Sequence, residues 1–413
     1  MPYPFLIEFY AEFYQWLSQI TFLDFIYIYW PLIIFDALRS IIKNTVVIIH
    51  KASPNKAEPP ATYPYISIII PAHNEEKGIE NSIQAALEAV YPHKEIIVVD
   101  DGSTDRTYEI AEKYSTRGLI KLIHRDYSSG SKAGALNNGI LFATGEIIIT
   151  VDADTLIERT ALLEIIKPFT RKDIVAVSGN VRILSGEEGG KNLLVRLQAF
   201  EYLQSLELGR RFNSLTGTLM IISGAFGAFR LKDVKSLGEY STSTMTEDFD
   251  MTIMFKKINK RIVFEEKAIS WTYCPETWRD WIRQRIRWTR GQAETLWRHK
   301  DIFSLNEYNL SFTVAAIDML LMDFALLFIR TGWLLYYALN QVRLFPFIML
   351  LMFIIYLFLE LVTTIIAGFL SPMKEDLKKI YLVPVMVLFY RPLYSLIRLY
   401  AYIQWTIKKE RSW

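Results

Sequence analysis

Apolar residues are concentrated towards the two ends of the chain, and a region of mixed polarity lies between them. The N-terminal run from Trp16 to Leu38 is long enough for a membrane span of about 20 residues, despite Asp24 and Pro31. Three further apolar blocks follow, at Leu310 to Leu339, Phe345 to Leu370 and Ile380 to Trp405. The pattern predicts one transmembrane helix before the central region and two or three after it.

Basic residues flank these runs and indicate their orientation. They include Arg39, Lys43 and Lys51 after the first run and Lys374, Lys378 and Lys379 before the last block. Because short cytoplasmic loops are enriched in Lys and Arg, we expect a multi-pass protein of the cell membrane whose central region is cytoplasmic. The last block contains Arg391 and Arg398, so it either crosses the membrane or lies along its surface.

Charged residues also occur inside the first C-terminal block, at Asp318, Asp323 and Arg330. Charge within the hydrocarbon core is costly and usually faces a bundle interior or a water-filled channel. The alternative is a position near a helix end, from which a flexible side chain reaches the interface. The sequence leaves both explanations open.

The central region alternates short β-branched runs with helical patterns, which predicts an α/β fold. The runs are nearly continuous, so we expect a Rossmann-like, mostly parallel sheet that is buried on both faces. The predicted strands are Tyr65 to Ile70, Glu95 to Val99, Leu119 to Ile123, Glu146 to Val151 and Ile174 to Ser178. Helices are predicted at Ile79 to Val90, Lys132 to Ala143 and Ile157 to Phe169.

These patterns divide the chain into five segments. We expect an N-terminal transmembrane anchor at residues 1–52, a Pro-rich linker at 53–64, the cytoplasmic α/β domain at 65–270, amphipathic interface helices at 271–308 and a C-terminal transmembrane or interfacial bundle at 309–413.

Composition excludes several other classes of protein. The 413 residues are 51% hydrophobic and 22% charged, which excludes an intrinsically disordered chain. A formal net charge of +2 gives no reason to expect a nucleic-acid partner. The single cysteine, Cys274, excludes an internal disulfide, and the five histidines form no HExxH zinc motif.

Polar groups follow three of the predicted strands where each strand ends, as PAHNEE at 71–76, DDGS at 100–103 and DAD at 152–154. Each is typical of an ordinary turn or helix cap, but the carboxyl ends of parallel strands converge on ligand sites. Paired carboxylates can share a divalent cation with a phosphate, so we expect a nucleotide diphosphate with Mg²⁺ or Mn²⁺. Lys132 opens a predicted helix and either meets that diphosphate or is a solvated surface lysine.

Two later motifs each have a structural and a functional interpretation. Thr246 precedes Glu247 and Asp248 and is either the N-cap of a helix with favourable acids or the entry to a general base for an acceptor hydroxyl. Gln284, Arg287 and Trp288 are spaced to share one helical face with Trp281. This Trp-rich, basic segment is also typical of an amphipathic helix on a membrane surface.

Taken in order, these motifs resemble family 2 inverting glycosyltransferases, especially the membrane-embedded processive kind that includes cellulose, hyaluronan and poly-N-acetylglucosamine synthases. The resemblance spans residues 66 to 291 and rests on IIIPAHNEE, VVDDGSTD, SKAGALNNG, VDADT, SGAFGAFR, TED and QRIRW. It implies a GT-A type domain inserted between transmembrane helices.

The resemblance also implies roles for individual residues. In the family, the matching residues that bind the nucleotide-sugar are Ala72, His73, Glu75, Asp101, Lys132 and Asp152. Asp154 would bind the metal, and Asp248 would act as the catalytic base. The residues that would contact the acceptor or the diphosphate are Gln284, Arg287, Trp288, Glu247, Ser223 and Gly224. His73 stands where the family often has tyrosine. The Ser223 to Phe226 segment is more similar to N-acetylglucosamine-polymer enzymes than to cellulose synthases, which favours UDP-N-acetylglucosamine as donor.

We therefore expect a processive transferase that uses a UDP-sugar to elongate a β-linked polysaccharide and passes the product across the lipid bilayer. One alternative is non-processive transfer to a lipid-linked acceptor, and another is a nucleotide-binding membrane transporter or scaffold with a degenerate site. The sequence identifies no accessory membrane subunit.

Overall fold

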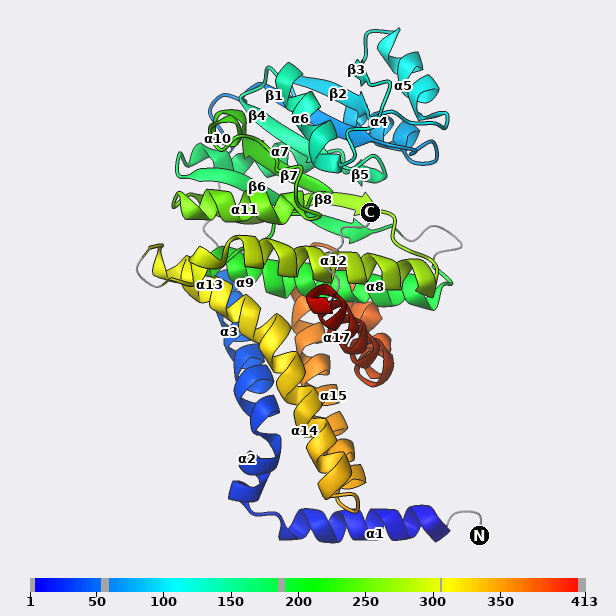
Figure 1. Ribbon diagram of the computed structural model, residues 1–413, viewed down its shortest axis with the longest axis vertical. Coiled ribbons are helices and arrows are strands. Elements are labelled where there is room, and N and C mark those ends of the chain that lie inside the picture. Colours follow the sequence, from blue (N-terminus) through cyan, green and yellow to red (C-terminus); the bar gives the residue numbers. More distant parts are fainter. Residues whose placement is uncertain (1–3, 53–58, 185–189, 305–306, 408–413) are drawn as a thin grey trace.

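The computed structural model describes residues 4–52, 59–184, 190–304 and 307–407. Figure 1 shows an α/β domain at one end, a layer of helices beneath it and long helices that extend away from that layer. Part of the predicted linker, residues 53–58, lies outside the described residues.

One eight-stranded sheet forms the centre of the α/β domain, in the order β3-β2-β1-β4-β7-β6-β8-β5. Its strands are β1 (Ile66–Ala72), β2 (Lys94–Asp100), β3 (Lys121–His124), β4 (Ile147–Val151), β5 (Thr155–Ile157), β6 (Ile174–Ile183), β7 (Phe226–Arg230) and β8 (Arg261–Thr272). The pairs β1–β2, β1–β4, β2–β3 and β6–β8 are parallel, whereas β7 is antiparallel to both of its neighbours and β5 is antiparallel to β8. The predicted fold class is confirmed.

All five predicted strands are present, and all except the short β3 are mostly buried. Along β1, Ile68 and Ile70 pack into one core with α4 (Ile79–Glu88) and α7 (Ala161–Ile166). Ile69 points to the other face and packs into the core beneath α6 (Lys132–Phe142) and α11 (Glu247–Lys257). The helix predicted from Ile157 begins later, because residues 155–157 pair with β8. The remaining helices of this domain are α5 (Thr107–Ser115), η2 (Lys167–Thr170) and α10 (Leu231–Ser236).

A layer of helices lies between the sheet and the apolar end of the molecule (Figure 1). It contains α8 (Leu193–Gln204), η3 (Ser205–Arg210), α9 (Arg211–Thr216), α12 (Trp278–Arg298) and η4 (Lys300–Phe303). Trp281 of α12 is fully buried, and its indole N–H donates to the Tyr390 hydroxyl at 3.0 Å. Trp281 therefore belongs to the core that joins this layer to the C-terminal helices.

The N-terminal apolar run is not one helix. Its elements are α1 (Pro4–Gln19), α2 (Phe22–Pro31), η1 (Leu32–Ala37) and α3 (Leu38–Ala52). Thr21 and Asp24 form a reciprocal capping box that starts a new helix at Phe22, so the predicted segment from Trp16 to Leu38 is divided near its start. Figure 1 shows α1 lying across the foot of the molecule. A membrane span in this part of the chain stays a prediction.

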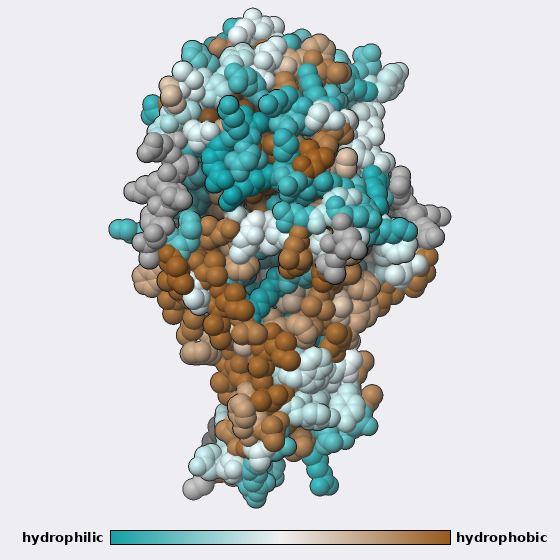
Figure 2. Space-filling model, turned by 90° about the vertical axis from the view of Figure 1, so that its left-hand side faces the viewer, coloured by the Kyte–Doolittle hydropathy of each residue, from teal (hydrophilic) through white to brown (hydrophobic). Residues whose placement is uncertain are grey.

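The C-terminal blocks form α13 (Leu310–Leu320), η5 (Leu321–Ala325), α14 (Leu326–Asn340), α15 (Phe345–Leu370), η6 (Lys374–Leu382), α16 (Val383–Val385), η7 (Met386–Tyr390) and α17 (Arg391–Ile407). Within the described residues, Phe345–Leu370 and the continuous stretch Lys374–Ile407 are long and apolar enough to cross a membrane. Figure 2 shows apolar surface gathered over the helices below the α/β domain. These observations support membrane association.

Charged residues inside the helical bundle are paired across it. Arg330 donates to Asp36 at 2.6 Å, and Arg39 donates to Asp318 at 2.5 Å. Both pairs join an N-terminal helix to the first C-terminal block. The Arg39 and Asp318 side chains are 38% and 45% exposed, so both explanations stay open for Asp318. The side chain of Asp323 lies outside what the structure describes.

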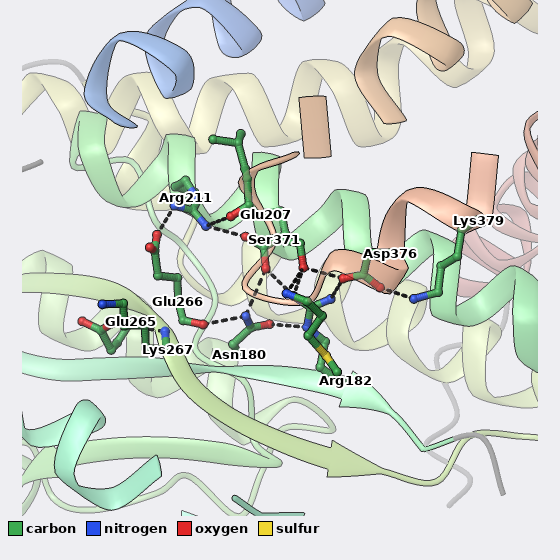
Figure 3. A network of polar contacts seen from close by, with 12 residues as sticks. Asn180, Arg182, Glu207, Arg211, Glu265, Glu266, Lys267, Ser371, Asp376 and Lys379 are labelled. Carbon is green, nitrogen blue, oxygen red and sulfur yellow. Dashed lines mark hydrogen bonds and ion pairs between the residues drawn. The ribbon is translucent and has the colours of Figure 1, made fainter. Parts of the chain in front are cut away.

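A buried ionic network joins the sheet to the C-terminal helices (Figure 3). Arg182 of β6 donates to Asp376 of η6 at 2.7 Å and also contacts Glu207 of η3. Arg211 of α9 contacts the same glutamate and Glu266 of β8. The network links the sheet, the helical layer beneath it and the C-terminal helices. Because a buried charge is costly without partners, the loss of any one member would destabilise this junction.

Candidate functional site

The carboxyl ends of β1 and β2 meet at one edge of the sheet. The backbone N–H of Asp101 donates to the carbonyl oxygen of Ala72 at 2.9 Å. His73 Nδ1 lies 2.8 Å from the carbonyl oxygen of Asp101. The motifs that follow these two strands are therefore in direct contact, as expected for neighbouring parallel strands.

The Asp101 carboxylate is buried and already has several protein partners. It accepts from the Ser129 backbone N–H at 2.8 Å and the Ser128 hydroxyl at 2.9 Å, and Arg125 adds an ion pair at 3.2 Å. The neighbouring Gly102 has φ of 69°, and a Cβ there would lie 2.5 Å from the Ser128 nitrogen, so this turn requires glycine. Asp101 thus orders the loop that leads into α6.

Three carboxylates, those of Glu75, Asp152 and Asp154, lie within electrostatic range of one another. Burial, with contributions from Asp154 and Asp152, raises the pKa of Glu75 to about 7. Burial and Asp152 likewise raise the pKa of Asp154, whose carboxylate accepts from the Thr272 hydroxyl at 3.4 Å. This concentration of negative charge fits a divalent cation. In the part of the chain that the structure describes, no three His, Cys, Asp or Glu side chains are spaced as metal ligands, so such a cation would need further oxygen ligands from a bound phosphate.

Lys132 is part of this acidic site and not a solvated surface lysine. Its ammonium contacts Asp152, lies 3.7 Å from Glu247 and donates to the carbonyl oxygen of Gly224 at 3.2 Å. Burial opposes the charged form, but the Asp152 and Glu247 carboxylates hold the pKa of Lys132 above its usual value. The side chain of Ser131 caps α6 and so fixes Lys132 at the first helical position.

Asp248 lies on the other side of Gly224. The Gly224 N–H donates to Asp248 Oδ2 at 3.1 Å, and the Phe249 N–H donates to Oδ1 at 2.8 Å. Burial raises the pKa of Asp248, although Lys132 and the two N–H groups oppose the increase. The two polar groups of one glycine residue therefore connect a buried carboxylate to the Lys132 ammonium.

As the helix-cap interpretation expects, Thr246 is the N-cap residue of α11 and is followed by Glu247 and Asp248 in the first helical turn. Its side chain makes no capping hydrogen bond to α11, and its hydroxyl instead lies 2.9 Å from the Thr295 hydroxyl of α12. Burial raises the pKa of the adjacent Glu247 despite the opposing charge of Lys132. Both acids of the motif therefore face the cluster around Lys132.

Arg210 is a residue of this site that the sequence did not reveal. Its guanidinium donates to the Ser178 hydroxyl at 3.0 Å, and the same hydroxyl lies 3.4 Å from the Ser223 backbone nitrogen. Arg210 is close enough to Asp248 to lower the pKa of that carboxyl. Arg210 and Arg211 are adjacent in the ELGRR segment, and no motif distinguishes one from the other. The sequence therefore contains no signal that identifies Arg210 as a site residue.

Gln284, Arg287 and Trp288 lie on α12, the helix whose later residues Gly291 and Thr295 pack against the turn at Thr246. Gly291 and Thr295 continue the same helical face. Gly291 follows Trp288 by three residues, and Thr295 follows Gly291 by four. A Cβ at Gly291 would lie 2.5 Å from Thr246 Cγ2, so α12 and this turn are in close contact. The structure shows no hydrogen bond or ion pair between the three predicted side chains and the carboxylates described above.

Arg285 supports Trp288 from the buried side of α12. Its guanidinium lies 4.5 Å from the centre of the Trp288 ring and 2.7 Å from Glu201. A guanidinium held over an indole ring restrains the orientation of that ring. The Trp288 ring is therefore held in a fixed orientation on α12.

Comparisons with known proteins agree with this architecture. Residues 67–238 match the model of Glycosyl transferase family 2. Poly-beta-1,6-N-acetyl-D-glucosamine synthase of Staphylococcus epidermidis is 33% identical over 234 residues, which cover 56% of this chain and 56% of that protein. The enzyme of the same name from Staphylococcus aureus strain COL is 32% identical over 240 residues, or 58% of this chain and 57% of that protein.

This chain spans about half the length of the curated relatives it matches. A solved structure of a mannosyltransferase from Pyrobaculum calidifontis, in complex with GDP-Man and Mn²⁺, covers 91% of this chain and 98% of its own with a TM-score of 0.61. At 18% identity that likeness shows a shared fold. The chain therefore contains a domain, residues 67–238, that matches glycosyl transferase family 2.

Proposed function

We propose that this chain transfers sugar from a UDP-sugar, with UDP-N-acetylglucosamine as the best candidate, to a growing β-linked polysaccharide with inversion at the anomeric carbon. The observation that carries this proposal is the arrangement around Gly224, where a buried carboxylate and an ammonium group contact the same residue. The similarity to poly-N-acetylglucosamine synthases supports the choice of donor.

The donor would bind across the carboxyl ends of β1, β2 and β4. Ala72, His73, Glu75 and Asp101 would line the nucleoside pocket, and Lys132 and Asp152 would lie beside the diphosphate. Asp154 would hold Mg²⁺ or Mn²⁺, in keeping with the accumulated negative charge and with the Mn²⁺ in the mannosyltransferase structure. When bound, the cation supplies charge neutralisation for the departing diphosphate.

Asp248 would act as the general base. Its carboxylate accepts the proton of an acceptor hydroxyl as that oxygen forms a bond to the anomeric carbon, and the bond from this carbon to the UDP oxygen breaks on the opposite face. The N–H groups of Gly224 and Phe249 orient the carboxylate, and burial raises its affinity for the proton. Lys132 stabilises the negative charge that develops on UDP.

The acceptor would lie between Asp248 and α12. Trp288 provides a stacking surface that Arg285 restrains, while Gln284 and Arg287 lie on the same helical face. Ser223, Gly224 and Glu247 complete this side of the site. Below it, the paired charges of the bundle offer hydrogen-bonding groups to a polar chain that passes between the helices.

The decisive experiment replaces the proposed base. Asp248→Asn should lower transfer by at least about 100-fold, because a positioned base contributes that much, and should leave UDP binding unchanged. Membranes that contain the full chain would be incubated with labelled UDP-N-acetylglucosamine and Mg²⁺ or Mn²⁺, and the product would be separated by size. Asp173→Asn, at the opposite edge of the sheet, is the matched control.

Two results would contradict the proposal. Undiminished transfer by Asp248→Asn would remove the assigned base. A short, organic-soluble glycolipid in place of a polymer would replace polysaccharide elongation with single transfer to a lipid-linked acceptor.

A further inference from the structure

A second polar cavity lies away from the acidic site, where the α/β domain meets the first long C-terminal helix. Its volume is about 300 Å³. The end of α9, the end of α11, the beginning of β8 and the beginning of α13 all contribute to its lining. The proposed sugar transfer uses none of its residues.

All charged residues that line this cavity are basic. Lys256, Lys260 and Arg261 line it, and the described lining residues include no Asp or Glu. Lys260 has an acidic neighbour outside the lining, Asp233, at 3.3 Å. The cavity therefore presents an excess of positive charge in a recess, where an anion is attracted strongly.

Lys256 is the buried member of this set and has little compensation from the protein. Its residue is 8% exposed, and its ammonium donates to the carbonyl oxygen of Gly217 at 2.8 Å. Burial and the nearby Arg261 lower the pKa of Lys256 to about 8. A buried ammonium beside a second cation favours a bound anion that offsets both.

The same cavity opens at the level where the apolar surface begins. Phe312 and Ser311 of α13 belong to its lining. Directly along this helix, Leu310, Val314 and Ile317 are 65%, 47% and 40% exposed. The basic cavity is suited to the phosphate of an anionic phospholipid headgroup, and the exposed apolar face of α13 is suited to the acyl chains of the same lipid.

We propose that this cavity binds a phosphate group, carried by an anionic phospholipid headgroup or by a soluble phosphate. The phospholipid fits the additional apolar face of α13. The shared requirement is the phosphate, which accepts charge-assisted hydrogen bonds from Lys256, Lys260 and Arg261. This inference goes beyond the proposed sugar transfer and stands without it.

The test uses the full chain purified in a neutral detergent and the double variant K260Q/R261Q. These two side chains are more exposed than Lys256, so their replacement should leave the fold intact, which an unchanged melting temperature would verify. Lys113→Gln, an exposed lysine on α5, is the matched control. Native mass spectrometry would measure binding of phosphatidylglycerol and phosphatidylcholine, and equilibrium dialysis would measure binding of inorganic phosphate.

Phosphatidylglycerol should bind the double variant about tenfold more weakly than the unmodified chain or K113Q, since two charge-assisted contacts are lost. Phosphatidylcholine binding should not differ among the three proteins. Inorganic phosphate binding that disappears in the double variant, without a change in phosphatidylglycerol binding, would identify the soluble source. Equal binding of both probes by all three proteins would overturn the proposal.

Discussion

At the scale of single residues, Gly224 determines how closely the proposed base and the ammonium group approach. A Cβ at this position would lie 3.1 Å from Lys132 Nζ and 3.2 Å from Asp248 Oδ2. Both distances are tighter than ordinary contacts, and both atoms belong to the candidate site. A glycine here is therefore explained by the space it leaves, and not by an unusual backbone conformation.

Gly224→Ala should lower kcat/KM for sugar transfer by about 100-fold, because small displacements of reacting groups are that costly. The melting temperature should change little. Gly332→Ala is the control, since no atom lies within 4 Å of the added Cβ there. Normal transfer by Gly224→Ala would show that the separation of Lys132 and Asp248 is not critical.

The acid limb of the pH profile provides a second prediction at this scale. A base must be ionised to accept a proton, and burial raises the pKa of Asp248. Transfer should therefore be lost as pH falls through a range higher than that of an ordinary aspartate. Glu247→Gln should move this limb of kcat/KM to lower pH, because it removes a neighbouring negative charge; an unmoved limb would argue against Asp248 as the titrating group.

At the scale of elements, apolar periodicity predicted β1, β2, β3, β4 and β6 and missed β5, β7 and β8. β1 is buried at every position, whereas β8 carries Glu265, Glu266 and Lys267 among its apolar residues. β5 has only three residues, and β7 (FGAFR) contains no β-branched residue, so neither resembles the β-branched runs that predicted the other strands. These strands form through pairing with distant segments, which a local pattern does not reveal.

The ionic network between β6 and η6 gives a prediction about how these elements are held together. Arg182→Met should destabilise the protein by about 3–5 kcal/mol, because it leaves the buried Glu207 and Asp376 carboxylates with fewer partners. A fall in melting temperature of the full chain in detergent would measure this effect.

Arg171→Met is the control for that experiment. Arg171 and Asp173 form an exposed pair at 2.8 Å, and such pairs contribute at most about 1 kcal/mol. Equal melting temperatures for both variants would mean that the buried network does not stabilise the junction between the sheet and the C-terminal helices.

At the scale of the whole molecule, the sequence predicted an α/β domain between apolar segments and the convergence of its polar strand ends. Lys132 and Asp248 lie 116 positions apart in the sequence, and only the family resemblance assigned both of them to one site. The spacing of Trp281 did not reveal that this side chain is buried against Tyr390, because helical spacing alone does not show which face of α12 packs against other elements. Arg210 was missed because its partners come from other elements.

The network around Arg182 also has a consequence for the time course of synthesis. Arg182 precedes its partner Asp376 by 194 residues, so the ribosome completes the sheet long before that carboxylate exists. During this interval Arg182 lacks one of its two carboxylate partners. The junction between the sheet and the C-terminal helices can therefore form only after the last segments of the chain have been made.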